Sequence, residues 1–224
     1  MHGRATVSSP PVAEVIRRLG PGERDLLPGH FLRLSAEDRH LRFGGPTGED
    51  RVRAYCARLD RPLPVVLGYL VDGVPRAVGE LKPIAGTLPP AAELAVSVEA
   101  PFRGRGVGTE LCRRLLVRAR NRLVARVHML CLLDNRRVQR IARGLGGALA
   151  FHPGEVEAEI GLPWPQPFSL AEEWLDELPP RAWPGGGRKS HRYLPRVAAL
   201  NEPAAPAAGP LPCTRPLLER RSRL

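Results

Sequence analysis

Residues 92–109 contain the feature that most limits how this chain can fold, a strand pattern that runs through a glycine-rich turn into a helix. In AELAVSVEA (92–100) apolar and polar side chains alternate, as in a half-buried β-strand. RGRGVG (103–108) follows, and from Val107 onward apolar residues recur at helical spacing. Glycines permit close backbone approach to a ligand, and the first N–H groups of a helix lack partners within it. Since the helix dipole adds positive charge there, we expect this turn to hold phosphate oxygens.

Two familiar phosphate-binding motifs do not fit this turn. A Walker loop requires GxxxxGK[ST], but the only lysines are Lys82 and Lys189. A dinucleotide-binding turn requires GxGxxG and an acidic residue about 20 positions later, whereas this chain has GxGxG followed by Arg126 and His128. The predicted ligand is therefore a polyphosphate, or a molecule that contains one, held also by the neighbouring arginines. A purely structural tight turn is the alternative interpretation.

The segment 12–162 has the pattern of one α/β domain behind a leader of residues 1–11. Ser35 and Asp38 form a capping box for a helix, and Asp72-Gly73 favours a hairpin turn. The expected strands are 12–19, 64–71, 76–84, 92–100, 125–133 and 155–162, and the expected helices include 34–43, 48–60, 107–123 and 138–145.

Beyond Pro163 the composition changes. Residues 163–178 predict a short amphipathic helix with Ser169 and Glu172 as a capping box, docked on the domain through Trp174 and Leu175. Residues 179–224 are rich in Pro, Gly and Arg and contain few large apolar side chains, so we predict a disordered basic tail.

The net charge of +11, from 34 basic and 23 acidic residues, is unevenly distributed. Residues 103–143 contain twelve arginines and two acidic residues, a local charge of +10. The tail contains nine basic and two acidic residues, a local charge of +7. We expect a solvated arginine face on the helix after the turn, made by Arg113, Arg114, Arg118, Arg120 and Arg122. The tail lacks an RNA-binding signature and interleaved aromatic residues, so we do not expect a nucleic-acid partner.

The remaining composition argues against export, membranes and metals. Cys56, Cys112, Cys131 and Cys213 are widely spaced without a CxxC pair, so we predict buried or free thiols and no metal site. No apolar run approaches the roughly 18 residues that a membrane helix needs. The N-terminus has no apolar segment after its charged start, so we expect a cytoplasmic location without a membrane partner.

ELAVSVEAPFRGRGVGTELCRRLL with HMLCLLDNRRVQRIARGLGG resembles the acetyl-CoA-binding core of the GCN5-related N-acetyltransferase (GNAT) superfamily. Arg103, Gly106 and Gly108 match the signature [QR]-x-x-G-x-[GA], and Asn135 stands at the usual asparagine after the next strand. HFLRLSAEDRHLRFGG resembles the entry segment of the bacterial protein-lysine acetyltransferase-like branch. Over residues 12–162 this implies an α/β fold with a GNAT-type mixed central sheet flanked by helices, to which a Pro/Gly/Arg-rich C-terminal tail is added.

The resemblance implies acetyl-CoA as co-substrate, no metal, and direct acetyl transfer to an amine. A main-chain N–H near Val98 would polarise the thioester carbonyl. Glu93 matches the family's glutamate and would act as base, with Glu80 on the neighbouring strand as the second candidate. The cofactor would be held by Ser97, Val98, Glu99, Arg103, Gly104, Arg105, Gly106, Val107, Gly108, Thr109 and Asn135.

One departure from the family pattern keeps alternatives open. Many members have a tyrosine about seven residues after the asparagine, which protonates the departing thiolate, but here that position is Ala142. The alternatives are a catalytically silent acyl-CoA-binding module, an acyltransferase for longer acyl chains and, less favoured, a basic nucleic-acid-binding protein. The acceptor, a protein lysine, an N-terminus or a small amine, stays open, and so does a homodimer.

Overall fold

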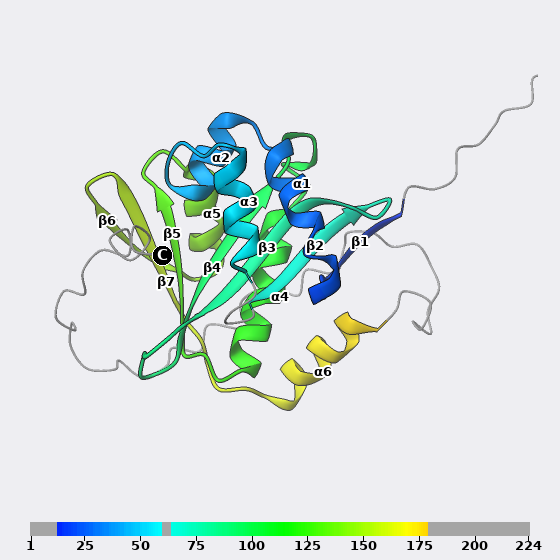
Figure 1. The fold of residues 1–224 in the computed structure, drawn as a ribbon. Coiled ribbons are helices and arrows are strands. Elements are labelled where there is room, and N and C mark those ends of the chain that lie inside the picture. Colours follow the sequence, from blue (N-terminus) through cyan, green and yellow to red (C-terminus); the bar gives the residue numbers. More distant parts are fainter. Residues whose placement is uncertain (1–12, 60–63, 179–224) are drawn as a thin grey trace, which may run out of the picture. The chain divides into compact units, whose positions relative to one another are not determined.

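The computed structural model describes residues 13–59 and 64–178, and they form a seven-stranded mixed sheet with helices on both faces (Figure 1). The predicted α/β class with a mixed, helix-flanked sheet is confirmed. The strand order is β1-β2-β3-β4-β5-β7-β6, and only the β4–β5 pair is parallel. The strands are β1 (Glu14–Arg18), β2 (Val65–Val71), β3 (Val74–Ile84), β4 (Ala91–Val98), β5 (Arg126–Leu132), β6 (Ala148–His152) and β7 (Glu155–Gly161).

Each face of the sheet has its own apolar core. On one face the cluster joins side chains of α1 (Leu26–Arg33), α3 (Glu49–Ala57), β2 and β3, with α2 (Ala36–Phe43) alongside. On the other face α4 (Val107–Asn121) and α5 (Arg136–Gly144) pack against β2, β3, β4, β5 and β7. Short 3-10 turns, η1 (Pro21–Glu23) and η2 (Ala100–Phe102), precede α1 and the glycine-rich turn. This two-sided burial explains why both helical and alternating strand patterns are needed in one chain.

The parallel pair β4–β5 is short, and its end creates the site. The register pairs only Ala91 with Arg126, Ala92 with Val127 and Glu93 with His128. Beyond Glu93 the two strands separate while β4 stays paired to β3 as far as Val98. From Leu94 to Val98, the edge of β4 that faces β5 is therefore not paired with that strand.

Most local sequence signals agree with the structure. Asp72 and Gly73 have φ of +50° and +80° in the β2–β3 turn, as the hairpin prediction requires. Ser35 Oγ accepts a hydrogen bond from Asp38 N at 3.0 Å and caps α2. β6 was not predicted from the sequence; it is a short edge strand whose residues are mostly exposed.

The prediction of a solvated arginine face on α4 is wrong. α6 (Pro167–Glu177) packs along this face, and Figure 1 shows it beside α4 at the bottom of the view. Its acidic residues pair with the α4 arginines: Glu172 with Arg113, Asp176 with Arg114 and Arg118, and Glu173 with Arg122. Arg120 donates instead to the Trp164 carbonyl. Arg118 and Arg120 are buried, Arg113 and Arg114 are half-buried, and Arg122 is exposed. Most of these arginines thus form ion pairs with α6 where the sequence predicted contacts with water.

The predicted docking of α6 through its apolar residues is also wrong, because the polar side of the helix packs against α4. Ser169, which is buried, and the acidic side chains face α4, while Trp174 and Leu175 are exposed. The predicted capping box is shifted as well. The N-cap is Gln166, whose backbone N–H donates to Ser169 Oγ at 3.1 Å, and Ser169 lies inside the helix. The residue pattern located the helix, but it did not show which of its faces is buried.

The cysteines and the possible membrane and metal sites are the remaining features that the sequence addressed. Cys56, Cys112 and Cys131 are buried free thiols, and burial raises the pKa of all three. Cys213, the leader and the basic tail lie outside the described residues. Within the described ranges no helix combines the length and the apolarity needed to cross a membrane. No three potential ligand side chains come together there as a candidate metal site.

Candidate functional site

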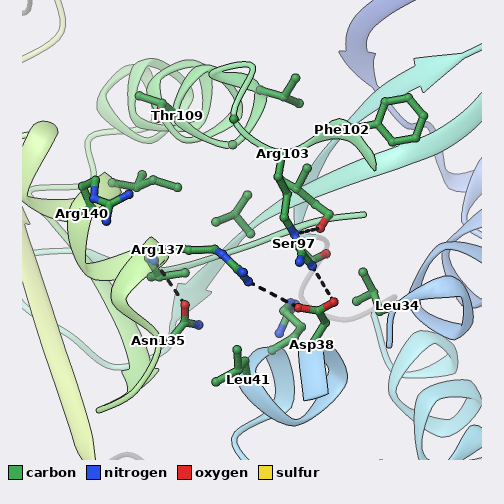
Figure 2. Close-up of a pocket in the computed structure, with 18 of the residues that line it drawn as sticks. Leu34, Asp38, Leu41, Ser97, Phe102, Arg103, Thr109, Asn135, Arg137 and Arg140 are labelled. Carbon is green, nitrogen blue, oxygen red and sulfur yellow. Dashed lines mark hydrogen bonds and ion pairs between the residues drawn. The ribbon is translucent and has the colours of Figure 1, made fainter. Parts of the chain in front are cut away.

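A cavity of about 450 Å³ lies where β4 separates from β5 (Figure 2). The end of β4, the turn at residues 103–109, α5 and α2 contribute to its wall. Its wall contains both apolar and basic side chains. Its lining is made by Leu34, Asp38, Leu41, Arg42, Val96, Ser97, Val98, Phe102, Arg103, Gly104, Gly106, Val107, Gly108, Thr109, Asn135, Arg137, Val138, Arg140 and Ile141.

The glycine-rich turn presents the start of α4 to this cavity. Gly104 and Gly106 have φ of +74° and +77°, a region that residues with a Cβ rarely adopt. Gly106 is the N-cap, and the first helical bond runs from Glu110 N to Gly106 O at 3.0 Å. The backbone N–H groups of Val107, Gly108 and Thr109 therefore have no partner within the helix. This arrangement suits an anionic group, as the sequence predicted.

Arginines from two elements meet at the cavity around one carboxylate. Figure 2 shows Asp38 of α2 between Arg103 and Arg137. Arg103 Nη2 is 2.6 Å from Asp38 Oδ2, and Arg137 Nη1 is 3.7 Å from Oδ1. Burial opposes ionisation of Asp38, but hydrogen bonds from Arg103 and Ser35 lower its pKa below the usual value. At neutral pH Asp38 thus neutralises part of a basic site that an anion would use.

The β4 backbone directs alternate N–H groups into the cavity. Glu99 N donates to Arg76 O of β3 at 3.0 Å, so Glu99 and Arg76 form a hydrogen-bonded pair. Because such pairs alternate along an antiparallel ladder, Val98 and Val96 point their N–H and C=O groups away from β3. Arg103 Nε donates to Val98 O at 3.0 Å on that side. The N–H of Val98 therefore lies on the side from which β5 has separated.

Asn135 lies at the opposite wall as the N-cap of α5. Its Oδ1 accepts from Val138 N at 3.3 Å, and the side chain is mostly buried. Ala142, at the position where the family pattern has tyrosine, is fully buried on the same helix within the core. No hydroxyl is therefore available from that position.

Of the residues predicted to bind the cofactor, nine line the cavity and two do not. The nine are Ser97, Val98, Arg103, Gly104, Gly106, Val107, Gly108, Thr109 and Asn135. Arg105 points its guanidinium towards Glu14, 3.9 Å away, with half of its side chain exposed. The Glu99 carboxylate is buried among basic side chains instead. Glu93, the predicted base, is half-buried opposite Lys82 and His128 in the sheet register and is not a lining residue.

A buried polar cluster beside the cavity was not expected from the sequence. His30 of α1, which is fully buried, has Nε2 2.8 Å from Ser97 Oγ and Nδ1 3.2 Å from Glu99 Oε1. Arg33 Nε donates to Glu99 Oε1 at 2.9 Å, and Arg76 Nη1 to Oε2 at 3.3 Å. No sequence signal joins His30 to residues 67 positions away.

Glu80, the second candidate base, is held in another buried cluster. Arg42 Nη2 donates to Glu80 Oε1 at 2.6 Å, and Tyr55 OH donates to Oε2 at 2.6 Å. Both side chains of the Arg42–Glu80 pair are almost fully buried. Burial and the nearby Glu80 charge raise the pKa of Tyr55. With both carboxylate oxygens bound, Glu80 is poorly suited to accept a proton from a substrate.

Comparison with known families decides the membership. The model of the acetyltransferase (GNAT) family matches residues 33–146, half of the chain. This chain is a member of the GNAT family. Every residue that lines the cavity, from Leu34 to Ile141, lies inside the matched region. The expected GNAT-type sheet is thereby confirmed.

Solved structures of GNAT proteins share the fold. The GNAT domain of S. lividans PAT is 23% identical, with a TM-score of 0.57 over 67% of this chain and 97% of that one. A ribosomal-protein-alanine N-acetyltransferase from Brucella melitensis is 16% identical, with a TM-score of 0.53 over 66% and 99% of the two chains. yncA from Salmonella typhimurium, solved with its cofactor acetyl-CoA, is 16% identical, with a TM-score of 0.51 over 69% and 96%. A search of curated proteins found no match.

Proposed function

We propose that this GNAT protein is an acetyl-CoA-dependent N-acetyltransferase that transfers acetyl directly to an amine. The observation that supports this most is the cavity between β4 and β5, which ends at the unpaired N–H groups of α4. Family membership supports an acyltransferase with acetyl-CoA as donor.

The donor set of the cavity fits the parts of acetyl-CoA. The N–H groups across residues 103–108 and the guanidinium of Arg103 suit the pyrophosphate. The apolar wall beside Val98 and Asn135 suits the pantetheine arm. Arg137 and Arg140 add positive charge at the same cavity. Anion and apolar requirements are thus met along one continuous surface.

The proposed mechanism uses backbone and side-chain groups of β4. The bound thioester supplies an activated acetyl group. The Val98 N–H would donate to its carbonyl oxygen, a contribution of roughly 10²–10³-fold in rate. An amine must lose a proton before it can attack, and Glu93 would take that proton, directly or through a water molecule. Because Glu93 lies outside the cavity lining, the route through water is favoured.

The proposal leaves open which kind of amine accepts the acetyl group. A protein lysine, an N-terminus and a small-molecule amine all present the required nitrogen. A longer acyl donor is a variant of the same activity. The competing function is a silent acyl-CoA-binding module, which the absence of tyrosine at Ala142 favours.

The test is calorimetric titration with acetyl-CoA, free CoA and ATP. We expect both CoA forms to bind and ATP not to bind. Gly106→Val and Arg103→Glu should each abolish CoA binding. Gly154 has an equally positive φ of +84° in the β6–β7 turn, so Gly154→Val is the matched control for backbone strain and should bind CoA normally. Wild-type CoA affinity in both site variants would refute the assignment.

Turnover is then measured as thiol release with a panel of amines. We expect release that depends on the amine and falls when Glu93 is changed to Gln. Binding of acetyl-CoA with no turnover on any amine, and no effect of Glu93→Gln, would establish the silent module instead.

A further inference from the structure

The His30 cluster has a defined hydrogen-bond direction. Arg33 and Arg76 contact the Glu99 carboxylate, and the hydrogen bonds from His30 and Arg33 lower the pKa of Glu99 although burial opposes this. An ionised carboxylate can only accept, so His30 Nδ1 carries the proton that is shared with Glu99. Burial lowers the pKa of His30 against the opposing effect of Glu99, and the ring is neutral.

The tautomer of His30 determines the direction of the Ser97 hydroxyl. With the proton on Nδ1, Nε2 is left with a lone pair, and Ser97 Oγ must donate to it across 2.8 Å. The lone pairs of Ser97 Oγ are then available to other donors. Ser97 lines the cavity, whereas His30 and Glu99 lie behind it. The three residues therefore connect the cavity to a buried proton acceptor.

We propose that Ser97 and His30 act as a proton shuttle in the transfer, with Glu99 as a positioning residue. The proposal rests on the N-acetyltransferase function. An amine that arrives as an ammonium loses two protons overall. The first goes to Glu93, and the second must leave the nitrogen as the C–N bond forms. Ser97 Oγ takes this second proton while its own proton moves to His30 Nε2.

The same path returns the proton to the leaving group. When the C–S bond breaks, the electron pair stays on sulfur, and a proton is needed there. His30 gives its proton back to Ser97, and Ser97 passes a proton to the sulfur. The shuttle ends in its starting state, with one C–N bond formed, one C–S bond broken and one proton moved from nitrogen to sulfur. It supplies the proton that the family's tyrosine would provide at the position of Ala142.

The first test observes the free protein by NMR of its histidine nitrogens at neutral pH. We expect the neutral Nδ1–H tautomer for His30, and a changed Nε2 signal in Ser97→Ala. The Nε2–H tautomer would overturn the proposal. This measurement is made on the wild-type chain, so it decides the question even where a variant folds poorly.

The second test measures thiol release from acetyl-CoA with hydroxylamine, a small amine that is largely neutral at pH 7. Ser97→Ala and His30→Gln should each lower kcat about 10²-fold, with little change in the KM for acetyl-CoA. Residues that act as one unit are non-additive, so the double variant should be no slower than either single variant. Ser169→Ala, also a buried hydrogen-bonded serine, is the control and should keep wild-type kcat.

The remaining outcomes separate the shuttle from the proposed function. Wild-type kcat in Ser97→Ala, or additive effects, would overturn the shuttle. Intact acetyl-CoA binding without any hydroxylamine-dependent release by the wild-type chain would also overturn it and leave the cofactor site standing. Failure to bind acetyl-CoA would overturn the proposed function itself.

A different observation supports a second proposal, the outward apolar face of α6. Phe168, Leu170, Trp174 and Leu175 are 78%, 53%, 63% and 43% exposed. Leu170 and Trp174, four residues apart, lie on the side of the helix away from Asp176, and Phe168 and Leu175 border this side next to Glu172. An apolar helix face of this kind on a folded domain marks an interaction surface.

We propose that a second copy of this chain covers this α6 face in a two-fold dimer. With about 150–250 Å² for a whole aromatic side chain, the exposed parts of the four residues offer on the order of 500 Å². A standard interface takes about 800 Å² from each partner, and homodimer interfaces are roughly 65% apolar, which corresponds to about 500 Å² of apolar surface. The exposed apolar area of α6 is of this size. A two-fold contact uses the same patch twice and needs no other surface. No lining residue of the cavity belongs to α6, so the dimer leaves the site accessible.

The test is the molar mass of the full chain in solution, measured by light scattering. We expect a dimer for the wild type and a monomer for the double variant Phe168→Ser/Trp174→Ser, with unchanged acetyl-CoA affinity in both. Leu88→Ser removes a leucine elsewhere that is even more exposed, and this variant should stay dimeric. A monomeric wild type would overturn the proposal, and so would a dimer that survives the double substitution. Binding of a monomeric wild type to lipid vesicles would assign the face to a membrane surface instead.

Discussion

The α4–α6 interface allows a stability prediction from one carboxylate. Asp176 contacts Arg114 Nη1 at 3.1 Å and Arg118 Nη1 at 3.2 Å, and the Arg118 side chain is only 1% exposed. Asp176→Ala leaves a buried guanidinium without its counter-charge. Removal of one partner of a buried pair costs about 3–5 kcal/mol. Arg118 also donates to the Arg114 carbonyl, and α6 can shift to admit water, so we expect about 2–3 kcal/mol.

This loss corresponds to a melting temperature lower by roughly 5–10 °C for a domain of this size, measured by calorimetry or urea denaturation. The exposed neighbour Glu177 provides the control, because Glu177→Ala should change the free energy of unfolding by less than about 0.5 kcal/mol. The double variant Arg118→Met/Asp176→Leu removes both charges and should recover most of the loss. A wild-type melting temperature in Asp176→Ala would refute the packing argument, and so would an Arg118→Met/Asp176→Leu variant as unstable as the single one.

Three further predictions concern the site. Asp38→Asn frees Arg103 and should tighten CoA binding about threefold to tenfold in low-salt calorimetry, whereas weaker binding would show that Asp38 positions the arginine. Asn135→Ala removes the N-cap of α5 and should lower the free energy of unfolding by about 1 kcal/mol in a urea titration. The folded-state pKa of His30 lies below its unfolded value, so the unfolded chain binds more protons as pH falls below about 6.5. Stability should therefore decrease from pH 7 towards pH 5, and His30→Gln should flatten this part of the profile.

Local patterns predicted the elements that line the cavity. The turn at residues 103–108 was predicted as a phosphate site because glycine conformations and helix-end donors are properties of a few consecutive residues. The β2–β3 hairpin and the cap of α2 follow from equally short signals. β6 escaped prediction because it is a short, exposed edge strand that forms by pairing with β7.

Contacts between distant segments decided the chemistry around the cavity. From the sequence, Glu80 was predicted as the second candidate base and Glu99 as a cofactor-binding residue. The fold gives Glu80 to Arg42 and Tyr55, and Glu99 to His30, Arg33 and Arg76. Such partners cannot be recognised from spacing, because hydrogen bonds depend on distances across packed elements and not along the chain.

The amino-acid sequence by itself determined the GNAT fold, the glycine-rich turn and the strand beside it, since these depend on local conformation and on the period of apolar residues. Only the tertiary structure decided which charged faces are buried. The α4 arginines and the α6 acids each have the pattern of a solvated surface, but packing of the two helices buries Arg118 and Arg120 and leaves the paired α6 acids half-buried. The apolar side chains of α6 are left exposed for the same reason, because the polar side of the helix, and not the apolar side, packs against α4.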